Sequence, residues 1–376
     1  MKSSEKSSVR EKMLKLLHKE EIEDLIVAPI VEVDYAASIT GRKFCSEITG
    51  YDAYFYAAEE CGYDPIFEVT HDVGNCVPQL KTQVDIIGKT DTSITRKHIF
   101  STPKGDLEMV TREEVGLVPI AIEAPPLDEK FYRILEWYFE KIASGNMDYI
   151  FSESEKLVQM VGDKGLTRIC VGNTTELAYA RYPEILFGYM EHEDLHLHTM
   201  DVYYEAQKVM MQAALKAGVD IIYASGVATE LTSPEMFSKT FLPYLTKQRA
   251  FTQAHGGLFY YHSCGHTKDF IERGFYNQIA PDIFETLSPP PQGVITDLRK
   301  ARKQLIPEIC TKGNISTELV RSGSQEDINK ATIDVIDSTA GFRHIVGLAD
   351  SVLYGTPPEN LKYMVDAVRA YKKSDQ

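Results

Sequence analysis

VDIIYASG (219–226), GLFYYHSCG (257–265) and APDIFETL (280–287) decide the fold of this chain. Each is a short run rich in β-branched or aromatic residues, and helix-like segments lie between them. Strands that alternate with helices form βαβ units, in which the strands pair in parallel. The sequence therefore predicts an α/β protein built on a parallel sheet.

The same alternation extends in both directions from this stretch. Further runs are DLIVAPIVEVD (24–34), DPIFEVTHD (64–72), LTRICVGN (166–173), PEICTKGN (307–314) and RHIVGLAD (343–350). Three of the helix candidates between the later runs open with Ser, Thr or Asn in a capping position, among them the segment beginning at Thr199. Eight such units predict a (β/α)8 TIM barrel, and a doubly wound open sheet is the alternative that this pattern leaves open.

Two segments lie outside the barrel pattern. Residues 1–23 predict an amphipathic N-terminal helix that crosses the outside of the fold, with Met13 and Leu17 on its apolar side. Residues 73–165 form an insertion with helices and an antiparallel β-hairpin, whose turn contains Pro-Lys-Gly (103–105), and this hairpin is a candidate lid. Because the chain has neither repeats nor a low-complexity linker, residues 1–376 are expected to form a single domain.

Composition excludes several classes of function. The net charge of −15 disfavours binding to nucleic acid or to anionic lipid, so the expected partners are a small molecule or another protein. No apolar stretch approaches the roughly 18 residues of a membrane span, and we expect a cytoplasmic protein. The phosphate-loop and GxSxG motifs are missing, so nothing favours a nucleotide enzyme or a serine hydrolase.

Polar side chains follow the predicted strands. They include Asp72, Asn173, Glu285, Asn314 and Asp350. In a TIM barrel the C-terminal ends of the strands converge on the active-site face, so these residues are candidates for binding substrate or moving a proton. The alternative is that strand ends are polar simply because they meet water.

His262 and Cys264 form the sharpest candidate pair. Residues two apart on a strand point to the same side, so both can hold one metal ion, and zinc accepts both ligand types. A catalytic zinc needs about three protein ligands and an open position, and the third donor can come from Asp350, Glu285 or His266. The alternative interpretation is a hydrogen-bonded histidine beside a packed thiol.

Several segments resemble those of one known superfamily. GYDPIFEVTHD, VATELTSPEMFSKTFLPYL, GLFYYHSCGHT, KGNIS and TPPENLKYMVDA follow one another from about residue 60 to the C-terminus. In this order they resemble the signatures of the uroporphyrinogen-decarboxylase-like superfamily. The resemblance implies a TIM barrel.

The superfamily that the chain resembles has two main branches. The decarboxylases of the superfamily carry an arginine-rich signature near the N-terminus, which binds a substrate with many carboxylates, whereas residues 1–60 here contain only Arg10 and Arg42. The cobalamin-dependent methyltransferases resemble this chain in having His-x-Cys on the fifth strand, here His262 and Cys264. In that branch the pair and a third cysteine bind zinc, and Asp350 occupies the corresponding slot in this chain.

The resemblance therefore implies a methyltransferase. We expect it to move a methyl group between a small substrate (a methyl ether, a methylamine or tetrahydrofolate) and a corrinoid (cobalamin) cofactor on a partner protein, with zinc held by His262, Cys264 and Asp350. An aspartate ligand leaves the metal more Lewis-acidic than a second thiolate, which favours oxygen or nitrogen donors. The alternatives are a zinc-free methylcorrinoid:tetrahydrofolate methyltransferase, a uroporphyrinogen decarboxylase and a barrel that binds a corrinoid protein or small ligand without turnover. A homodimer is also compatible with this sequence.

Overall fold

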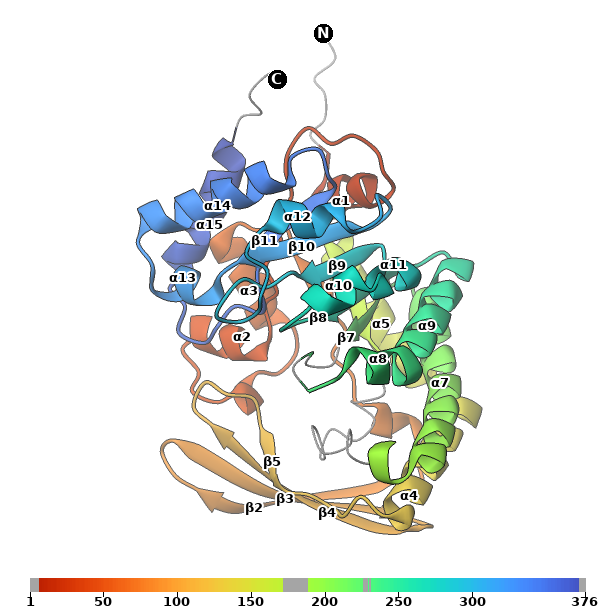
Figure 1. Ribbon diagram of the computed structural model, residues 1–376. Coiled ribbons are helices and arrows are strands. Elements are labelled where there is room, and N and C mark those ends of the chain that lie inside the picture. Colours follow the sequence, from red (N-terminus) through yellow and green to blue (C-terminus); the bar gives the residue numbers. More distant parts are fainter. Residues whose placement is uncertain (1–6, 172–188, 226–228, 230, 372–376) are drawn as a thin grey trace.

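Parallel strands form the centre of the molecule in this computed structural model, which describes residues 7–171, 189–225, 229 and 231–371 (Figure 1). Seven strands pair in the order β1-β6-β7-β8-β9-β10-β11. Their bounds are β1 (Ile66–Glu68), β6 (Leu166–Cys170), β7 (Ile221–Ser225), β8 (Leu258–Ser263), β9 (Ile283–Thr286), β10 (Cys310–Ile315) and β11 (His344–Leu348). Six of them fall within the runs predicted from the sequence, and β10 extends one residue beyond its run, to Ile315.

The first predicted run, residues 24–34, occupies the eighth position of the barrel. The N–H of Ala28 donates to the carbonyl of Val346 on β11 at 2.8 Å, and the N–H of Val346 donates to the carbonyl of Ile26 at 2.9 Å. On the other side, the N–H of Asp64, just before β1, donates to the carbonyl of Val27 at 2.7 Å. The sheet therefore curls into a TIM-barrel-like fold, as predicted, and the open-sheet alternative is wrong.

Helices surround the barrel and connect its strands. Ser233 caps α8 by accepting from the N–H of Met236 at 3.1 Å, and Pro234 occupies the first turn. The helix predicted to open at Thr199 begins earlier, at Glu193. The bounds are α2 (Val33–Ile39), α3 (Asp52–Cys61), α4 (Glu129–Ser144), α5 (Asp148–Val161), α7 (Glu193–Lys216), α8 (Pro234–Thr240), α9 (Leu242–Ala254), α10 (Lys268–Glu272), α11 (Phe275–Ile279), α12 (Leu298–Lys303), α13 (Thr317–Ser322), α14 (Gln325–Thr339) and α15 (Pro358–Ala370). None of the helices in the described ranges is long and apolar enough to cross a membrane.

The N-terminal helix α1 (Val9–Leu17) closes the bottom of the barrel. Met13, Leu16 and Leu17 are buried against the first residues of the strands, including Leu166, Ile221, Leu258, Ile283 and Ile345. Arg10 of α1 donates to Asp220, just before β7, at 2.7 Å. The prediction that this helix crosses the outside of the fold is therefore wrong, because its apolar side meets the barrel interior.

Removing the α1 side chain that lies deepest is expected to destabilise the whole barrel. Met13 is fully buried, so Met13→Ala should lower the free energy of unfolding by about 2 to 5 kcal/mol. Urea unfolding measures this change. Glu11→Ala on the exposed side of α1 removes only a surface pair with Lys15, so it serves as the control. Equal losses in the two variants would contradict the role of α1 as a plug.

The insertion forms a four-stranded antiparallel sheet at the opposite end of the molecule from α1 (Figure 1). The predicted hairpin is present as β3 (Ser93–Thr102) and β4 (Gly105–Glu114), with Pro103 and Lys104 in the turn. Strands β2 (Lys81–Lys89) and β5 (Ile120–Glu123) extend it on either side, which the sequence analysis did not predict. Helices α4 and α5 then lead back to the barrel.

A buried carboxylate ties this sheet to the segment that follows α2. Glu113 of β4 is fully buried, and it pairs with Arg96 of β3 at 2.7 Å. The same carboxylate accepts from the backbone N–H and the hydroxyl of Ser46, at 2.8 and 2.7 Å. Because a buried carboxylate is costly to leave unpaired, this network fixes the sheet on the mouth side of the barrel.

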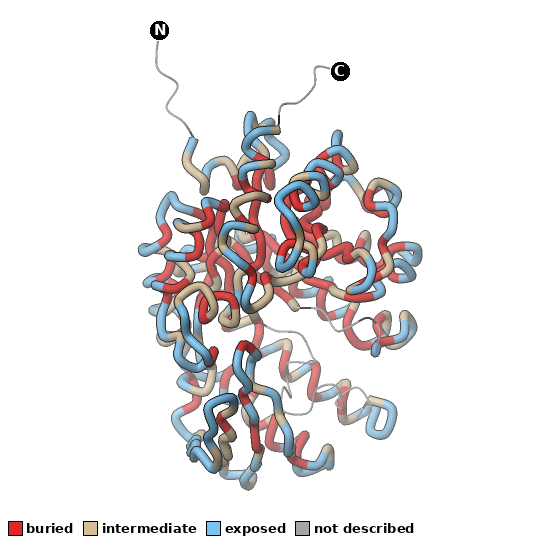
Figure 2. Tube along the Cα trace, turned by 90° about the vertical axis from the view of Figure 1, so that its left-hand side faces the viewer, coloured by how far each residue is buried: buried red, intermediate tan, exposed pale blue. Residues whose placement is uncertain are grey.

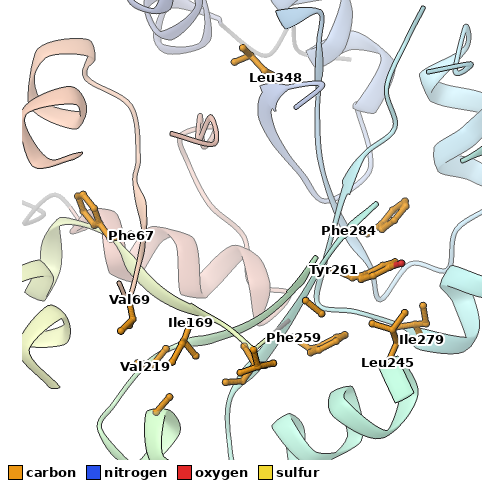
Figure 3. Packing of buried hydrophobic residues seen from close by; sticks show 14 of the residues in the cluster. Phe67, Val69, Ile169, Val219, Leu245, Phe259, Tyr261, Ile279, Phe284 and Leu348 are labelled. Atoms are coloured by element: carbon orange, nitrogen blue, oxygen red, sulfur yellow. The ribbon is translucent and has the colours of Figure 1, made fainter. Parts of the chain in front are cut away.

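The core has two parts, which β8 separates. Leu258 and Tyr260 point into the barrel, whereas Phe259 and Tyr261 belong to the outer cluster between strands and helices. Figure 3 shows Phe259 and Tyr261 near Leu245, and the buried segments run through the middle of the molecule in Figure 2. By the period of two along a strand, His262 continues the inward series.

Candidate active site at the barrel mouth

Three donor side chains meet where β8 and β11 end. His262 lies near the end of β8, Cys264 follows that strand, and Asp350 follows β11. One ligand atom from each, a ring nitrogen, the Sγ and a carboxylate oxygen, all lie within 4.8 Å of one another. The N–H of Ser351 donates to a carboxylate oxygen of Asp350 at 2.8 Å. The structure thus brings together the three residues that the sequence analysis had grouped, from segments about 90 residues apart.

Glu285 of β9 fixes the orientation of the His262 ring through a hydrogen bond. The Nδ1 of His262 donates to Oε1 of Glu285 at 2.9 Å, and the Nζ of Lys312 donates to Oε2 at 2.5 Å. Glu285 and Lys312 are almost completely buried. With Nδ1 engaged, Nε2 is the ring nitrogen left for another partner. Glu285 is therefore not a third donor of the group but a support for His262.

The charges in this network favour an ionised Glu285. Burial alone raises the pKa of Glu285, but the charge of Lys312 and the hydrogen bond from His262 outweigh it and lower the pKa to about 2. Burial lowers the pKa of His262, whereas its hydrogen bonds with Cys264 and Glu285 and the charge of Asp350 raise it well above its usual value. The carboxylate of Glu285 is thus a fixed negative charge behind the imidazole.

The other described site residues make local hydrogen bonds outside this group. Asp72 is exposed and accepts from the N–H of Gly74 at 2.9 Å, so it caps a local turn. Asn314 of β10 is buried, and its amide donates to the carbonyl of Leu287 at 2.7 Å. Asn173 lies outside the described residues. Of the predicted residues, the structure therefore joins His262, Cys264, Asp350 and Glu285.

A cavity of about 370 Å³ opens beside this group, between the first strands of the barrel. Polar and apolar groups both contribute to its wall, and the charged side chains in it are Glu32, Glu68 and Arg168. Its lining residues are Pro29, Val31, Glu32, Val33, Ile48, Gly50, Tyr54, Tyr63, Pro65, Ile66, Phe67, Glu68, Val69, Thr70, His71 and Arg168. Its size is within the range of small-molecule sites.

Arg168 of β6 organises the charged side of the cavity. Its Nε lies 2.7 Å from a carboxylate oxygen of Glu68, and a terminal nitrogen lies 4.0 Å from Glu32. The guanidinium stacks on Tyr223, with its Cζ 4.0 Å from the ring centre. Since Arg168 is buried, its charge needs these carboxylates, and Glu68 is the closer partner.

Glu32 has only the longer of the two ion pairs with Arg168. Burial raises its pKa to about 7, and the nearby charge of Glu68 adds to the effect against the opposing charge of Arg168. Its side chain is nevertheless 47% exposed, and it lines the cavity. Glu32 is therefore the carboxyl group of the cavity wall whose pKa is raised furthest toward neutral pH.

Comparison with known proteins places the chain in a family. The sequence profile described as "Uroporphyrinogen decarboxylase (URO-D)" matches residues 139–371, more than half of the chain. The chain belongs to the URO-D family. This confirms the resemblance found in the sequence, and the family match includes His262, Cys264, Asp350, Glu285 and Arg168.

Individual relatives of this URO-D family chain are distant. A uroporphyrinogen decarboxylase from Microcystis aeruginosa is 32% identical over 79 residues, which is 21% of this chain and 22% of that enzyme. The chain thus aligns with about a fifth of that relative's length. A structure of a methyltransferase from Methanosarcina mazei is 14% identical and covers 96% of this chain and 98% of that one, with a TM-score of 0.67. At this identity the likeness establishes the shared fold.

Neither Arg10 nor Arg42, the arginines near the N-terminus of this URO-D family chain, lines the cavity. Arg10 pairs with Asp220 at the bottom of the barrel. The backbone carbonyl of Arg42 accepts from the hydroxyl of Tyr354. The cavity wall contains Arg168, which already pairs with Glu68. Among the described residues that line the cavity, Arg168 is therefore the one arginine, and its guanidinium is already paired with the carboxylate of Glu68.

Glu32, Glu68 and Arg168 were missed by the sequence analysis. Glu32 lies at the end of the first predicted run, where the strand-end argument could have found it. Arg168 stands inside the apolar segment LTRIC of β6, and a charge within a buried strand is itself a signal of an inward-facing ion pair. No pattern in the sequence singled out Glu68, because its ion pair with Arg168 is visible only in the structure.

Proposed function

We propose that this protein is a methyltransferase that moves a methyl group between a small oxygen or nitrogen donor and a corrinoid cofactor on a partner protein, assisted by zinc. The observation that carries the proposal is the convergence of His262, Cys264 and Asp350 within 4.8 Å at the barrel mouth. In TIM-barrel enzymes the mouth is where the chemistry takes place.

The three side chains fit a zinc ion. Zinc bonds of about 2.0 to 2.3 Å in a tetrahedron place the ligand atoms about 3.5 Å apart, so atoms now within 4.8 Å need to close by little more than about 1 Å. Glu285 supports the arrangement, because a carboxylate on the far nitrogen of a zinc-binding histidine fixes its orientation and raises its basicity. Three protein ligands leave a fourth position for a substrate atom.

Zinc in this position would act as a Lewis acid on the oxygen or nitrogen that carries the methyl group. The protein's part is to fix His262 through Glu285, to orient the substrate in the neighbouring cavity and to exclude water from it. The corrinoid would supply the methyl-transfer chemistry itself. We propose that its carrier protein docks over the mouth.

One comparison and one feature of the cavity support this proposal over decarboxylation. The chain shares its fold along nearly its whole length with the Methanosarcina mazei methyltransferase. A substrate with many carboxylates needs several cationic partners, whereas Arg168, the guanidinium in the described cavity wall, is already paired with Glu68. The family name alone therefore does not decide the reaction.

The proposal is tested by following methylcobalamin formation from reduced cobalamin by absorbance. Methyl ethers, methylamines and methyltetrahydrofolate serve as donors. We expect transfer from an oxygen or nitrogen donor, loss of transfer when a chelator removes the metal, and recovery with added zinc. Unchanged transfer from methyltetrahydrofolate in metal-free protein would instead support the zinc-free methyltransferase. Conversion of uroporphyrinogen without any methyl transfer would support a decarboxylase.

A further inference from the structure

Exposed apolar side chains are concentrated on the four-stranded sheet. Among the described residues, 14 large hydrophobic side chains are exposed, and eight of them lie between residues 81 and 123. These eight are Val84, Ile86, Ile87, Val115, Leu117, Val118, Ile120 and Ile122. Because this stretch is only about an eighth of the described residues, they are not the scattered apolar side chains of an ordinary surface. Such a concentration marks a contact site.

Five of the eight lie on one edge of the sheet, in what we call the apolar strip, residues 115–122. The strip consists of the turn after β4 and most of β5, and its exposed members are Val115, Leu117, Val118, Ile120 and Ile122. β5 is the last strand of the sheet order, so β4 is its strand partner within the described residues. The register with β4 shifts at Ile122, which has no partner there. An edge of this kind is a template for pairing with another chain.

Contacts with the barrel side hold the apolar strip in one position. The N–H of Gly116 donates to the carbonyl of Lys43 at 3.1 Å. The Sγ of Cys45 donates to the carbonyl of Leu117 at 3.4 Å. Gly116 also packs closely on the ring of Tyr354, since a Cβ at this glycine would lie 2.6 Å from ring atoms. A surface that is already ordered loses less entropy when it binds a partner.

We infer that the apolar strip is the interface between two copies of this chain. In this homodimer, β5 of one copy pairs in antiparallel register with β5 of the other, about a two-fold axis at Ala121. The two sheets then form one continuous eight-stranded sheet. This inference does not depend on the proposed methyl transfer.

The sequence of β5 matches itself in this register. Ile120 lies opposite the partner's Ile122, and Ala121 lies opposite the partner's Ala121. Glu123, the one charged residue of β5, lies opposite the partner's Pro119, so no charge faces a like charge. A two-fold interface requires a surface that is complementary to itself. The Ile-Ala-Ile segment meets this requirement.

The charge of the sheet favours a second copy as the occupant. The whole chain has a net charge of −15, whereas residues 81–123 contain six Lys and Arg against seven Asp and Glu, a net charge of −1. Two copies of an acidic chain repel each other, and this repulsion is weakest where the local charge is close to zero. A basic partner protein would gain more from the acidic remainder of the chain.

The opposite edge of the sheet, β2, does not fit a second copy in the same way. Three of the exposed apolar residues lie on it, but Lys81 and Lys89 stand at its ends and Asp85 at its centre. Charged residues on an edge strand, lysine above all, protect it from pairing. Antiparallel pairing along the full length of β2 would place Lys81 opposite the partner's Lys89 and Asp85 opposite the partner's Asp85, which is destabilising.

Sedimentation velocity of the full chain over a concentration series tests the interface. We expect a dimer with a Kd on the order of 10 µM, because a strand pair with a short apolar strip is smaller than a standard interface. Ile120→Lys should raise this Kd by at least about 100-fold, since the substitution acts twice in a two-fold interface. Ile86→Lys on β2 is the matched control, because Ile86 and Ile120 are 61% and 59% exposed, and it should leave the Kd unchanged. A monomer at every concentration, or a dimer that Ile120→Lys leaves intact, would overturn the inference.

A disulfide across the two-fold axis tests the register. Directly opposite Cα atoms of antiparallel strands are about 4.5 to 5.5 Å apart, which is within the range that a disulfide spans. Ala121→Cys should therefore form a covalent dimer when oxidised glutathione is added. Wild type, with its six cysteines, and Glu123→Cys, which lies opposite the partner's Pro119, should not. If Ala121→Cys forms no covalent dimer, or forms it no faster than Glu123→Cys does, the pairing of β5 with its copy is wrong.

Discussion

Asp350→Ala is expected to lose bound zinc and to lower the rate of methyl transfer by about 1,000-fold. The variant leaves His262 and Cys264 as the remaining donors, one short of the three that a catalytic zinc site needs. Lewis-acid assistance contributes several kcal/mol, and each 1.36 kcal/mol is a factor of about ten in rate. Elemental analysis of protein purified without chelator and the cobalamin assay measure the two effects.

Asp350→Cys is the matched control for this prediction. It restores the cysteine that the resembling methyltransferases carry in this slot, so it should keep zinc while lowering the rate with ether donors, because a second thiolate makes the metal less Lewis-acidic. Full zinc content in Asp350→Ala would contradict the role of Asp350 as a ligand. Loss of zinc in both variants would show that the site tolerates no change of this donor.

Lys312→Met is expected to lower the free energy of unfolding by about 3 to 5 kcal/mol, since it leaves a buried carboxylate without its cation. Lys312 and Glu285 are almost completely inaccessible and 2.5 Å apart. The charge of Lys312 is also the main force that lowers the pKa of Glu285 against its burial. Urea unfolding at neutral pH measures the loss.

The double variant Lys312→Met with Glu285→Gln controls for lost packing. Because it removes both charges, it should recover more than half of the stability that Lys312→Met loses. It should still transfer methyl groups poorly, because a glutamine supports His262 less well than a carboxylate does. A double variant as unstable as Lys312→Met would show that packing, and not charge, accounts for the loss.

The barrel and the donor group could be predicted because both follow from local patterns. Strand runs alternating with helices indicate a parallel sheet, and the rule that the strand ends converge at the mouth grouped Asp350 with His262 and Cys264 from distant segments. The same rule made Asp72 a candidate, and the structure shows its side chain capping a local turn. A strand-end position therefore identifies candidates and cannot tell which of them point inward.

The charged wall of the cavity could not be predicted in the same way. Arg168 is paired with Glu68 from a strand about 100 residues away, and the proton affinity of Glu32 depends on that pairing. Such effects depend on three-dimensional distances that no spacing in the sequence encodes. The predicted position of α1 was wrong for a related reason. An apolar stripe on a helix indicates that this side of the helix is buried, but it does not indicate which part of the protein covers it.

The central claim is that His262, Cys264 and Asp350 bind one zinc ion. X-ray absorption at the zinc edge of the purified protein tests it most directly, because sulfur ligands lie at about 2.3 Å from zinc and nitrogen or oxygen ligands at about 2.0 to 2.2 Å. We predict one zinc per chain with a single sulfur ligand and the remaining ligands nitrogen or oxygen. Protein that contains no zinc, or zinc with no sulfur ligand or with two or more, would contradict the account.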